Sequence, residues 1–164
     1  MLRTPALSAT LVLLALLAVF AAAKVDDAGF GSKYSWHSLD DGLLAARDSG
    51  KPAMVLIHKS WCGACKALKP QFAASSAIEK LSQQFVMIIA GDDDEPADQK
   101  FAEDGKYVPR IYFLDSKGAV IEGIKNEQGN PNYKHFYPTP DGIVASMSKA
   151  LKAKRARPAS QEEL

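Results

Sequence analysis

The chain of 164 residues fits one ordinary domain, because single hydrophobic cores usually organise about 100 to 200 residues. Hydrophobic residues make up 47% of the chain and charged residues 24%, a globular composition that excludes disorder as the main state. The 20 Lys and Arg residues against 19 Asp and Glu leave a net charge of +1, too little for nucleic-acid binding through phosphate neutralisation.

The first 23 residues have the pattern of a secretory signal peptide. Arg3 is followed by an apolar run over 11–20 and then by Ala21-Ala22-Ala23, which supplies a small-residue cleavage site. We expect cleavage after Ala23; the alternative is a signal anchor, whose span needs about 20 strongly apolar residues. Cleavage would deliver the chain, without a membrane segment, to an oxidising compartment where disulfides persist.

The next elements are a predicted helix and a predicted strand. Ser38 can cap a helix over 38–49, in which apolar residues recur at helical spacing until Gly50 ends it. The continuous apolar run over 53–57 is typical of a central strand that is covered on both faces.

A kinked helix and a second strand are expected to follow. The segment 61–82 has a helical pattern, and Pro70 inside it removes one backbone donor, which predicts a kink. The apolar run over 85–89 predicts a second buried strand. The acidic run that follows, over 91–96, lacks the spacing of a calcium loop, so we expect a solvated loop rather than a metal site.

The last part of the domain predicts a hairpin and a helix. The runs 111–114 and 119–121 flank a Gly-containing turn over 115–118, which indicates antiparallel strands. An amphipathic helix is expected over 141–154, with an inward face made by Ile143, Val144, Met147 and Leu151. Together these elements predict an α/β domain with a central mixed β-sheet flanked by α-helices.

The chain ends in a short tail after the predicted domain. We place the signal peptide at 1–23, the domain at 24–157 and the tail at 158–164. The last four residues resemble the K-D-E-L and H-D-E-L retrieval signals of the endoplasmic reticulum, although the first two positions differ. These residues are Gln161, Glu162, Glu163 and Leu164. We therefore expect retention in the endoplasmic reticulum lumen, with secretion as the alternative.

The two cysteines, Cys62 and Cys65, have a spacing that favours chemistry over a structural role. A bridge between them closes so short a loop that it contributes about 2 kcal/mol, less than the roughly 3 kcal/mol of a 15-residue loop. At a helix N-terminus the unpaired amides and the helix dipole favour a sulfur anion, here at Cys62. Cys65, one turn further, can release a client from a mixed disulfide with Cys62. We therefore predict Cys62 as the attacking thiol and Cys65 as the resolving thiol.

A metal site is the alternative use of these thiols. Structural zinc needs four ligands, and the three histidines, His37, His58 and His135, do not have finger spacing. A soft copper(I) site would need fewer ligands and stays open. We expect no metal and no cofactor beyond the cysteine pair.

Three features together resemble the thioredoxin superfamily. They are the apolar strand before the cysteines, Val108-Pro109 before a later strand, and the string Lys59-Ser60-Trp61-Cys62-Gly63-Ala64-Cys65-Lys66-Ala67-Leu68-Lys69-Pro70. With Gly129-Asn130-Pro131 and the acidic-Leu terminus, the chain is similar to the small endoplasmic-reticulum oxidoreductases related to the anterior gradient proteins. The resemblance covers 31–151. It implies a thioredoxin fold, a cis proline at Pro109, and substrate binding by Trp61, Gly63, Ala64, Val108 and Pro109.

The chain departs from this resemblance at two positions. Superfamily members usually carry a buried carboxylate six residues before the first cysteine, where it accepts the proton of the resolving thiol. This chain has Leu56 there, so His58 or water would have to accept that proton. Isomerases carry Gly-His where this chain has Gly63-Ala64, which should make its disulfide a weaker oxidant.

The resemblance and the cysteine pair together predict the function. We expect a thiol-disulfide oxidoreductase of the endoplasmic reticulum lumen that forms or reduces disulfides in cysteine-containing secretory clients. Extended clients would bind across Trp61 and Val108-Pro109, because backbone pairing suits many sequences. Glutathione or another redox partner of that compartment would exchange electrons with the pair. The alternative is a client-binding or partner-binding module, like the anterior gradient proteins, with little redox turnover.

Overall fold

The structure is a computed structural model that describes residues 25–156. The predicted signal peptide and the retrieval-like residues 161–164 lie outside the described residues. In chain order the elements are β1 (Trp36–His37), α1 (Leu39–Ser49), β2 (Ala53–His58), α2 (Gly63–Ala74), α3 (Ser76–Ser82), β3 (Val86–Gly91), the 3-10 helices η1 (Asp92–Asp94) and η2 (Gln99–Phe101), β4 (Arg110–Leu114) and α4 (Pro140–Ala156).

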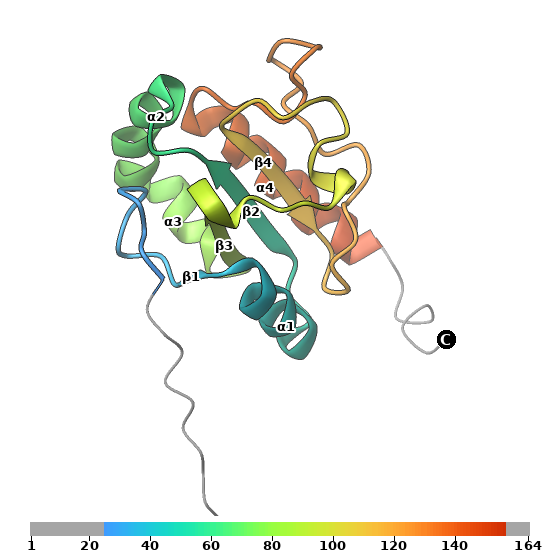
Figure 1. The fold of residues 1–164 in the computed structure, drawn as a ribbon. Coiled ribbons are helices and arrows are strands. Elements are labelled where there is room, and N and C mark those ends of the chain that lie inside the picture. Colours follow the sequence, from blue (N-terminus) through green and yellow to red (C-terminus); the bar gives the residue numbers. More distant parts are fainter. Residues whose placement is uncertain (1–24, 157–164) are drawn as a thin grey trace, which may run out of the picture.

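The four described strands form one mixed sheet in the order β1-β3-β2-β4, which confirms the predicted sheet type. Strands β1, β3 and β2 are parallel, and β4 is antiparallel to β2 (Figure 1). The register pairs His58 with Gly91 and Ile57 with Arg110. The end of β2 therefore lies beside both the end of β3 and the beginning of β4, and the chain leaves β2 there toward α2.

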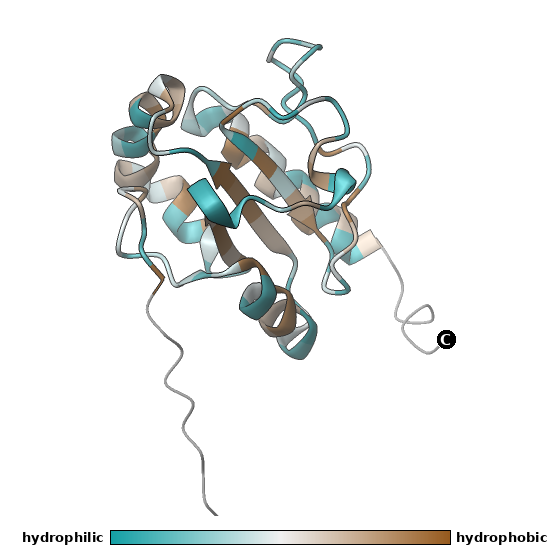
Figure 2. Ribbon diagram, viewed as in Figure 1, coloured by the Kyte–Doolittle hydropathy of each residue, from teal (hydrophilic) through white to brown (hydrophobic). Residues whose placement is uncertain are grey.

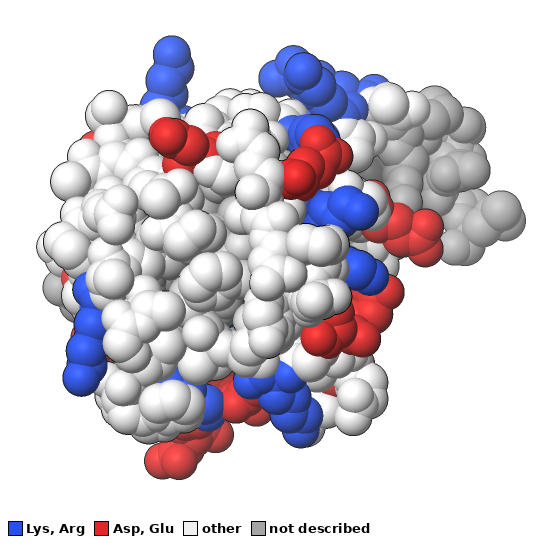
Figure 3. Space-filling view, turned by 90° about the horizontal axis from the view of Figure 1, so that it is seen from above, with Lys and Arg blue, Asp and Glu red and all other residues white. Residues whose placement is uncertain are grey.

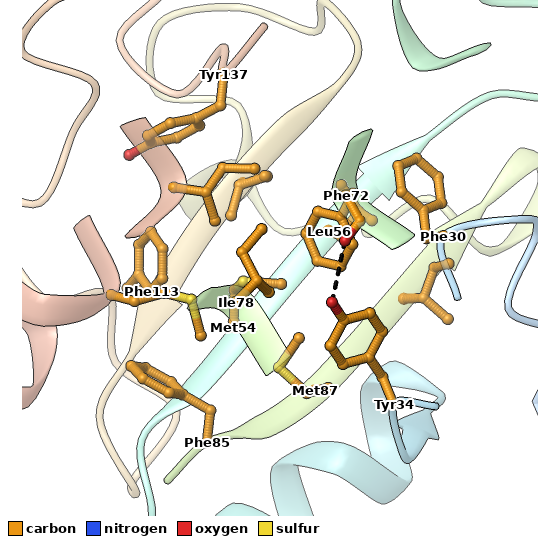
Figure 4. Packing of buried hydrophobic residues seen from close by; sticks show 14 of the residues in the cluster. Phe30, Tyr34, Met54, Leu56, Phe72, Ile78, Phe85, Met87, Phe113 and Tyr137 are labelled. Carbon is orange, nitrogen blue, oxygen red and sulfur yellow. Dashed lines mark hydrogen bonds between the residues drawn. The ribbon is translucent and has the colours of Figure 1, made fainter. Parts of the chain in front are cut away.

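Each face of the sheet is covered, so the central strands are apolar on both sides. Alternate residues of β2 point to opposite faces, and the brown of apolar residues is concentrated on the central strands in Figure 2. Met54 and Leu56 belong to a core that includes residues of α2, α3 and α4 (Figure 4). Val55 and Ile57 belong to a second core, with residues of α1 and η2.

Helix α1 has the predicted boundaries. The Ser38 hydroxyl accepts a hydrogen bond from the Asp41 amide at 3.3 Å, which satisfies one of the free donors at the helix start. Gly50 ends the helix in the left-handed conformation, with φ of 63°, where glycine has no steric cost. The two signals read from the sequence are therefore the ones that the structure uses.

The single kinked helix predicted over 61–82 is wrong, because the structure has two helices there. Helix α2 continues through Pro70 to Ala74, and the interruption falls at Ser75, which has an extended conformation with φ of −72° and ψ of 109°. The Ser75 hydroxyl then accepts a hydrogen bond from the Ile78 amide at 3.2 Å and caps α3. A serine cap, rather than the proline, breaks the helix.

The predicted hairpin is present, but it is shorter than expected. Its first strand is β4, but the second is a single antiparallel bridge between Leu114 and Val120. The Asp115 and Ile121 amides donate to Ala119 and Phe113, both at 2.8 Å, and close the turn. Helix α4 buries Ile143, Met147 and Leu151 as predicted, whereas Val144 is only partly buried. The short strand β1 was not predicted from the sequence.

Candidate functional site

Cys62 lies where β2 passes into α2. It is the N-cap of α2, and its sulfur accepts a hydrogen bond from the Cys65 amide at 3.1 Å. The first amides of a helix have no partner within the helix, so a sulfur in this place receives both a donor and the positive end of the helix dipole. The structure therefore places the Cys62 sulfur at the N-terminus of α2, where the sequence predicted it.

The two thiols differ in their access to solvent. Both are free, but Cys62 is 6% exposed and Cys65 is fully buried beneath it. Burial, followed by the hydrogen bond with Cys62, raises the pKa of the Cys65 thiol from 9.0 to about 12. Cys62 is therefore the more accessible of the two thiols, and the raised pKa keeps Cys65 protonated at neutral pH.

The segment before β4 contacts Cys62. The peptide bond between Val108 and Pro109 is cis, as the resemblance implied. The Cys62 thiol donates to the Val108 carbonyl at 3.5 Å, so the backbone before the proline lies directly beside the thiol. Trp61 is 71% exposed next to Cys62 and offers a large apolar surface.

The other residues expected to bind substrate differ in exposure. Gly63 and Ala64 begin α2 and are exposed, Val108 is half-buried and Pro109 is buried. The structure thus brings Cys62, Cys65 and Val108 together, with Trp61 exposed beside them. Their roles in substrate binding stay predictions.

Leu56 lies in an apolar environment. Its side chain is fully buried in the first core, at the end of the cluster where Phe30 and Phe72 also lie (Figure 4). Leu56 therefore offers no carboxylate to accept the proton of Cys65, and the role of Cys65 as resolving thiol stays a prediction.

His58, on the same face of β2, is buried, and burial lowers the pKa of its imidazole. Its ring lies 5.4 Å from the ring of Phe30, and its Nδ1 has no hydrogen-bond partner among residues 25–156. A Cβ atom on Gly91 would be 2.6 Å from Nε2 of His58, so glycine at position 91 makes room for the imidazole. A proton-accepting role for His58 stays a prediction.

A charged network that was not predicted from the sequence lies beside the cysteines. Glu95 accepts hydrogen bonds from Arg110 at 2.6 Å and from Lys59 at 2.8 Å, one on each carboxylate oxygen. Although burial acts to raise it, the two cations hold the pKa of Glu95 below its usual range. Asp92 accepts from the Ser60 amide at 2.9 Å, and Lys59 also donates to the Asp92 carbonyl.

The acidic run after β3 therefore has a more specific role than the solvated loop that was expected. Asp92, Asp93 and Asp94 are exposed, which agrees with the expectation, but Glu95 is half-buried and paired with two cations. No local pattern around Glu95 indicated this pairing, because its partners Lys59 and Arg110 are distant along the chain. Within 25–156, no group of three or more His, Cys, Asp or Glu side chains is arranged to hold a metal ion.

The surface at this end of the sheet carries few charges. Figure 3 shows the molecule from above, from the end where β2 leads into α2, and most Lys, Arg, Asp and Glu side chains lie around the rim of this face. Its middle is uncharged. In the part of the chain that the structure describes, no helix has the length and apolar character needed to cross a membrane.

The fold and the cysteine site define a thioredoxin-like protein, and residues 35–116 match the thioredoxin-like family. The chain belongs to this family, and within it the chain is related to the anterior gradient proteins. It is 35% identical over 126 residues to anterior gradient protein 3 of Mus musculus, which covers 76% of this chain and 75% of that protein.

Further comparisons agree. Anterior gradient protein 2-B of Xenopus laevis is 32% identical over 124 residues, covering 75% of this chain and 74% of that protein. The crystal structure of a poplar wild-type thioredoxin h shares the fold with a TM-score of 0.50 and 19% identity. That match covers 71% of this chain and 96% of the poplar chain.

Proposed function

We propose that this protein is a thiol-disulfide oxidoreductase of the endoplasmic reticulum lumen that acts on cysteines of secretory clients. The observation that carries the proposal is the position of Cys62, whose sulfur accepts a hydrogen bond from the Cys65 amide in the first turn of α2 and contacts the Val108 carbonyl. An extended client that pairs with the backbone at Val108 would bring its own sulfur to Cys62. The uncharged middle of this face suits clients of varied sequence.

The proposed reduction of a client transfers two electrons in two exchanges. The Cys62 thiolate attacks one sulfur of the client disulfide, which forms a mixed disulfide and releases the other client sulfur as a thiolate that takes up a proton. Cys65 then loses its proton and attacks the Cys62 sulfur. The second client thiol leaves, and Cys62 and Cys65 end as a disulfide. Oxidation of a client is the reverse sequence, and glutathione or another redox partner would restore the pair.

Two single substitutions test the proposal. Cys62→Ser should abolish turnover of a peptide disulfide, because no thiol then meets the client. Cys65→Ser should accumulate the mixed disulfide between Cys62 and the client, because the intramolecular release is lost. Both outcomes are read by non-reducing electrophoresis after acid quenching. Equal residual turnover in the two variants would contradict the proposal.

A second candidate is a client-binding module with little redox turnover. The low exposure of Cys62, at 6%, beside the high exposure of Trp61, at 71%, favours it, since this surface offers an apolar contact before it offers a thiol. Binding of unfolded clients that survives both reductant and the double Cys→Ser substitution, without detectable turnover of peptide disulfides, would favour this candidate over the oxidoreductase.

A further inference from the structure

Arg110 is a buried cation whose main charged partner is Glu95. The Arg110 side chain is 1% exposed, and its Nη2 donates to Glu95 at 2.6 Å. Its Nη1 donates to the Tyr107 carbonyl at 2.5 Å, while Nε has no hydrogen-bond partner among residues 25–156. A guanidinium removed from water to this degree needs a paired anion, because an unpaired buried charge is strongly destabilising. Glu95 therefore supplies the anion that the buried Arg110 guanidinium needs.

The network reaches both segments that meet at the contact between the Cys62 thiol and the Val108 carbonyl. Arg110 directly follows Pro109, and its side chain donates to the Tyr107 carbonyl. It therefore connects the backbone after Val108 with the backbone before it. In the cysteine segment, the Lys59 carbonyl accepts a hydrogen bond from the Cys62 amide at 3.2 Å. The carboxylate of Glu95 joins these two cations with one oxygen each.

We propose that Glu95 is a positioning residue that fixes the client-binding backbone at Val108 relative to the Cys62 thiol. The proposal rests on the proposed function, because it assumes that clients pair with this backbone. The Glu95 carboxylate closes a connection from Cys62 through Lys59 to Arg110, and from there to the segment that contains Val108. The direct contact between the two segments is a thiol-to-carbonyl hydrogen bond of 3.5 Å, which is weak by comparison with the charged pairs.

This role differs from that of an ordinary surface ion pair. The side chains of Lys59 and Glu95 are 16% and 24% exposed, so water screens their interaction less than it screens an exposed pair. Loss of the carboxylate charge would leave Arg110 held by the Tyr107 carbonyl and Lys59 held by the Asp92 carbonyl, with no charged link between the two cations. The spacing of Val108 and Cys62 would then change. In a reaction that depends on position, a misplacement of about 1 Å can lower the rate by up to about a hundredfold.

The test is a comparison of peptide affinity in Glu95→Gln and a matched control. The control is Glu79→Gln, which removes an ion pair of the same 2.6 Å length, with Lys33, on α3. Affinity for a labelled, reduced and alkylated unstructured peptide is measured by anisotropy in a Cys62→Ala, Cys65→Ala background, so that no turnover is required. The rate of Cys62 alkylation by iodoacetamide is measured with both cysteines present.

Glu95→Gln should weaken peptide binding about tenfold and leave the alkylation rate within about twofold, while Glu79→Gln should change neither. Lys59→Met, which keeps the buried pair of Arg110 and Glu95, should weaken peptide binding in the same direction even if Glu95→Gln folds poorly. Unchanged peptide affinity in folded Glu95→Gln or in Lys59→Met, an equal loss in Glu79→Gln, or no affinity in the parent background would overturn the proposal. Intact peptide binding without disulfide turnover would overturn the proposed oxidoreductase function alone.

Discussion

The release of a client by Cys65 should be limited by the loss of its proton. Burial raises the pKa of this thiol from 9.0 to about 12, so the thiolate fraction at pH 7 falls from about one in a hundred to about one in a hundred thousand. In the mixed disulfide Cys62 is no longer a thiol, so its contribution to the raised pKa of Cys65 is lost. Burial, which is the largest cause of the raised pKa, remains. The release rate should therefore rise about tenfold per pH unit from pH 7 to at least pH 9.

A carboxylate at position 56 should relieve this limit. Leu56 is fully buried in the first core, at the position where superfamily members place their proton acceptor. Leu56→Asp should raise the release rate at pH 7 by at least about tenfold, since a positioned general base contributes about a hundredfold or more. Leu56→Asn has the same shape without a basic group and serves as the matched control. Both substitutions place a polar group in an apolar core, so each protein is studied well below its unfolding temperature.

The assay is a single turnover. A client peptide is attached to Cys62 through an activated mixed disulfide, the pH is changed, and peptide release is followed by rapid mixing and acid quenching. A release rate that levels off below pH 9 in the wild-type protein, or that rises equally in Leu56→Asp and Leu56→Asn, would refute the reasoning about Cys65.

Two further predictions concern other parts of the molecule. Gly91→Ala should lower the free energy of unfolding by about 1 to 3 kcal/mol, because the new Cβ would lie 2.6 Å from the buried His58 ring; Gly63→Ala, which meets no atom within 4 Å, should not, and equal denaturation midpoints would contradict this. Deletion of Gln161 to Leu164 should release the chain into the culture medium, and replacement by Lys-Asp-Glu-Leu should keep it inside the cell; equal retention of the truncated chain would show that the ending is not a retrieval signal.

Local signals predicted most of the fold. Ser38 and Gly50 mark the ends of α1 because capping depends on side chains next to the helix itself. The break at Ser75 was missed because a serine within a helical pattern is ambiguous, whereas Pro70 gives the stronger local signal. Strand β1 was missed because its two residues form a strand only through their pairing with β3, which is a tertiary interaction.

The candidate site also has a part that local sequence signals predicted and a part that depends on tertiary contacts. Cys62 and Cys65 lie one helical turn apart, so their spacing was enough to indicate their chemistry. The network around Glu95 joins segments that are far apart in the chain, and only the fold brings them together. The burial of Arg110 could not be read from the sequence either, since an arginine at the start of a strand is usually exposed.

Equilibration of the reduced protein in glutathione buffers tests the redox pair most directly. Acid quenching and alkylation then separate the dithiol, the Cys62–Cys65 disulfide and glutathione adducts by mass. A redox-active pair should convert reversibly between dithiol and internal disulfide in the wild-type protein, and Cys65→Ser should form a stable glutathione adduct on Cys62. A protein that stays fully reduced across all buffers, or that takes up glutathione on both cysteines without forming the internal disulfide, would contradict the redox role of the pair.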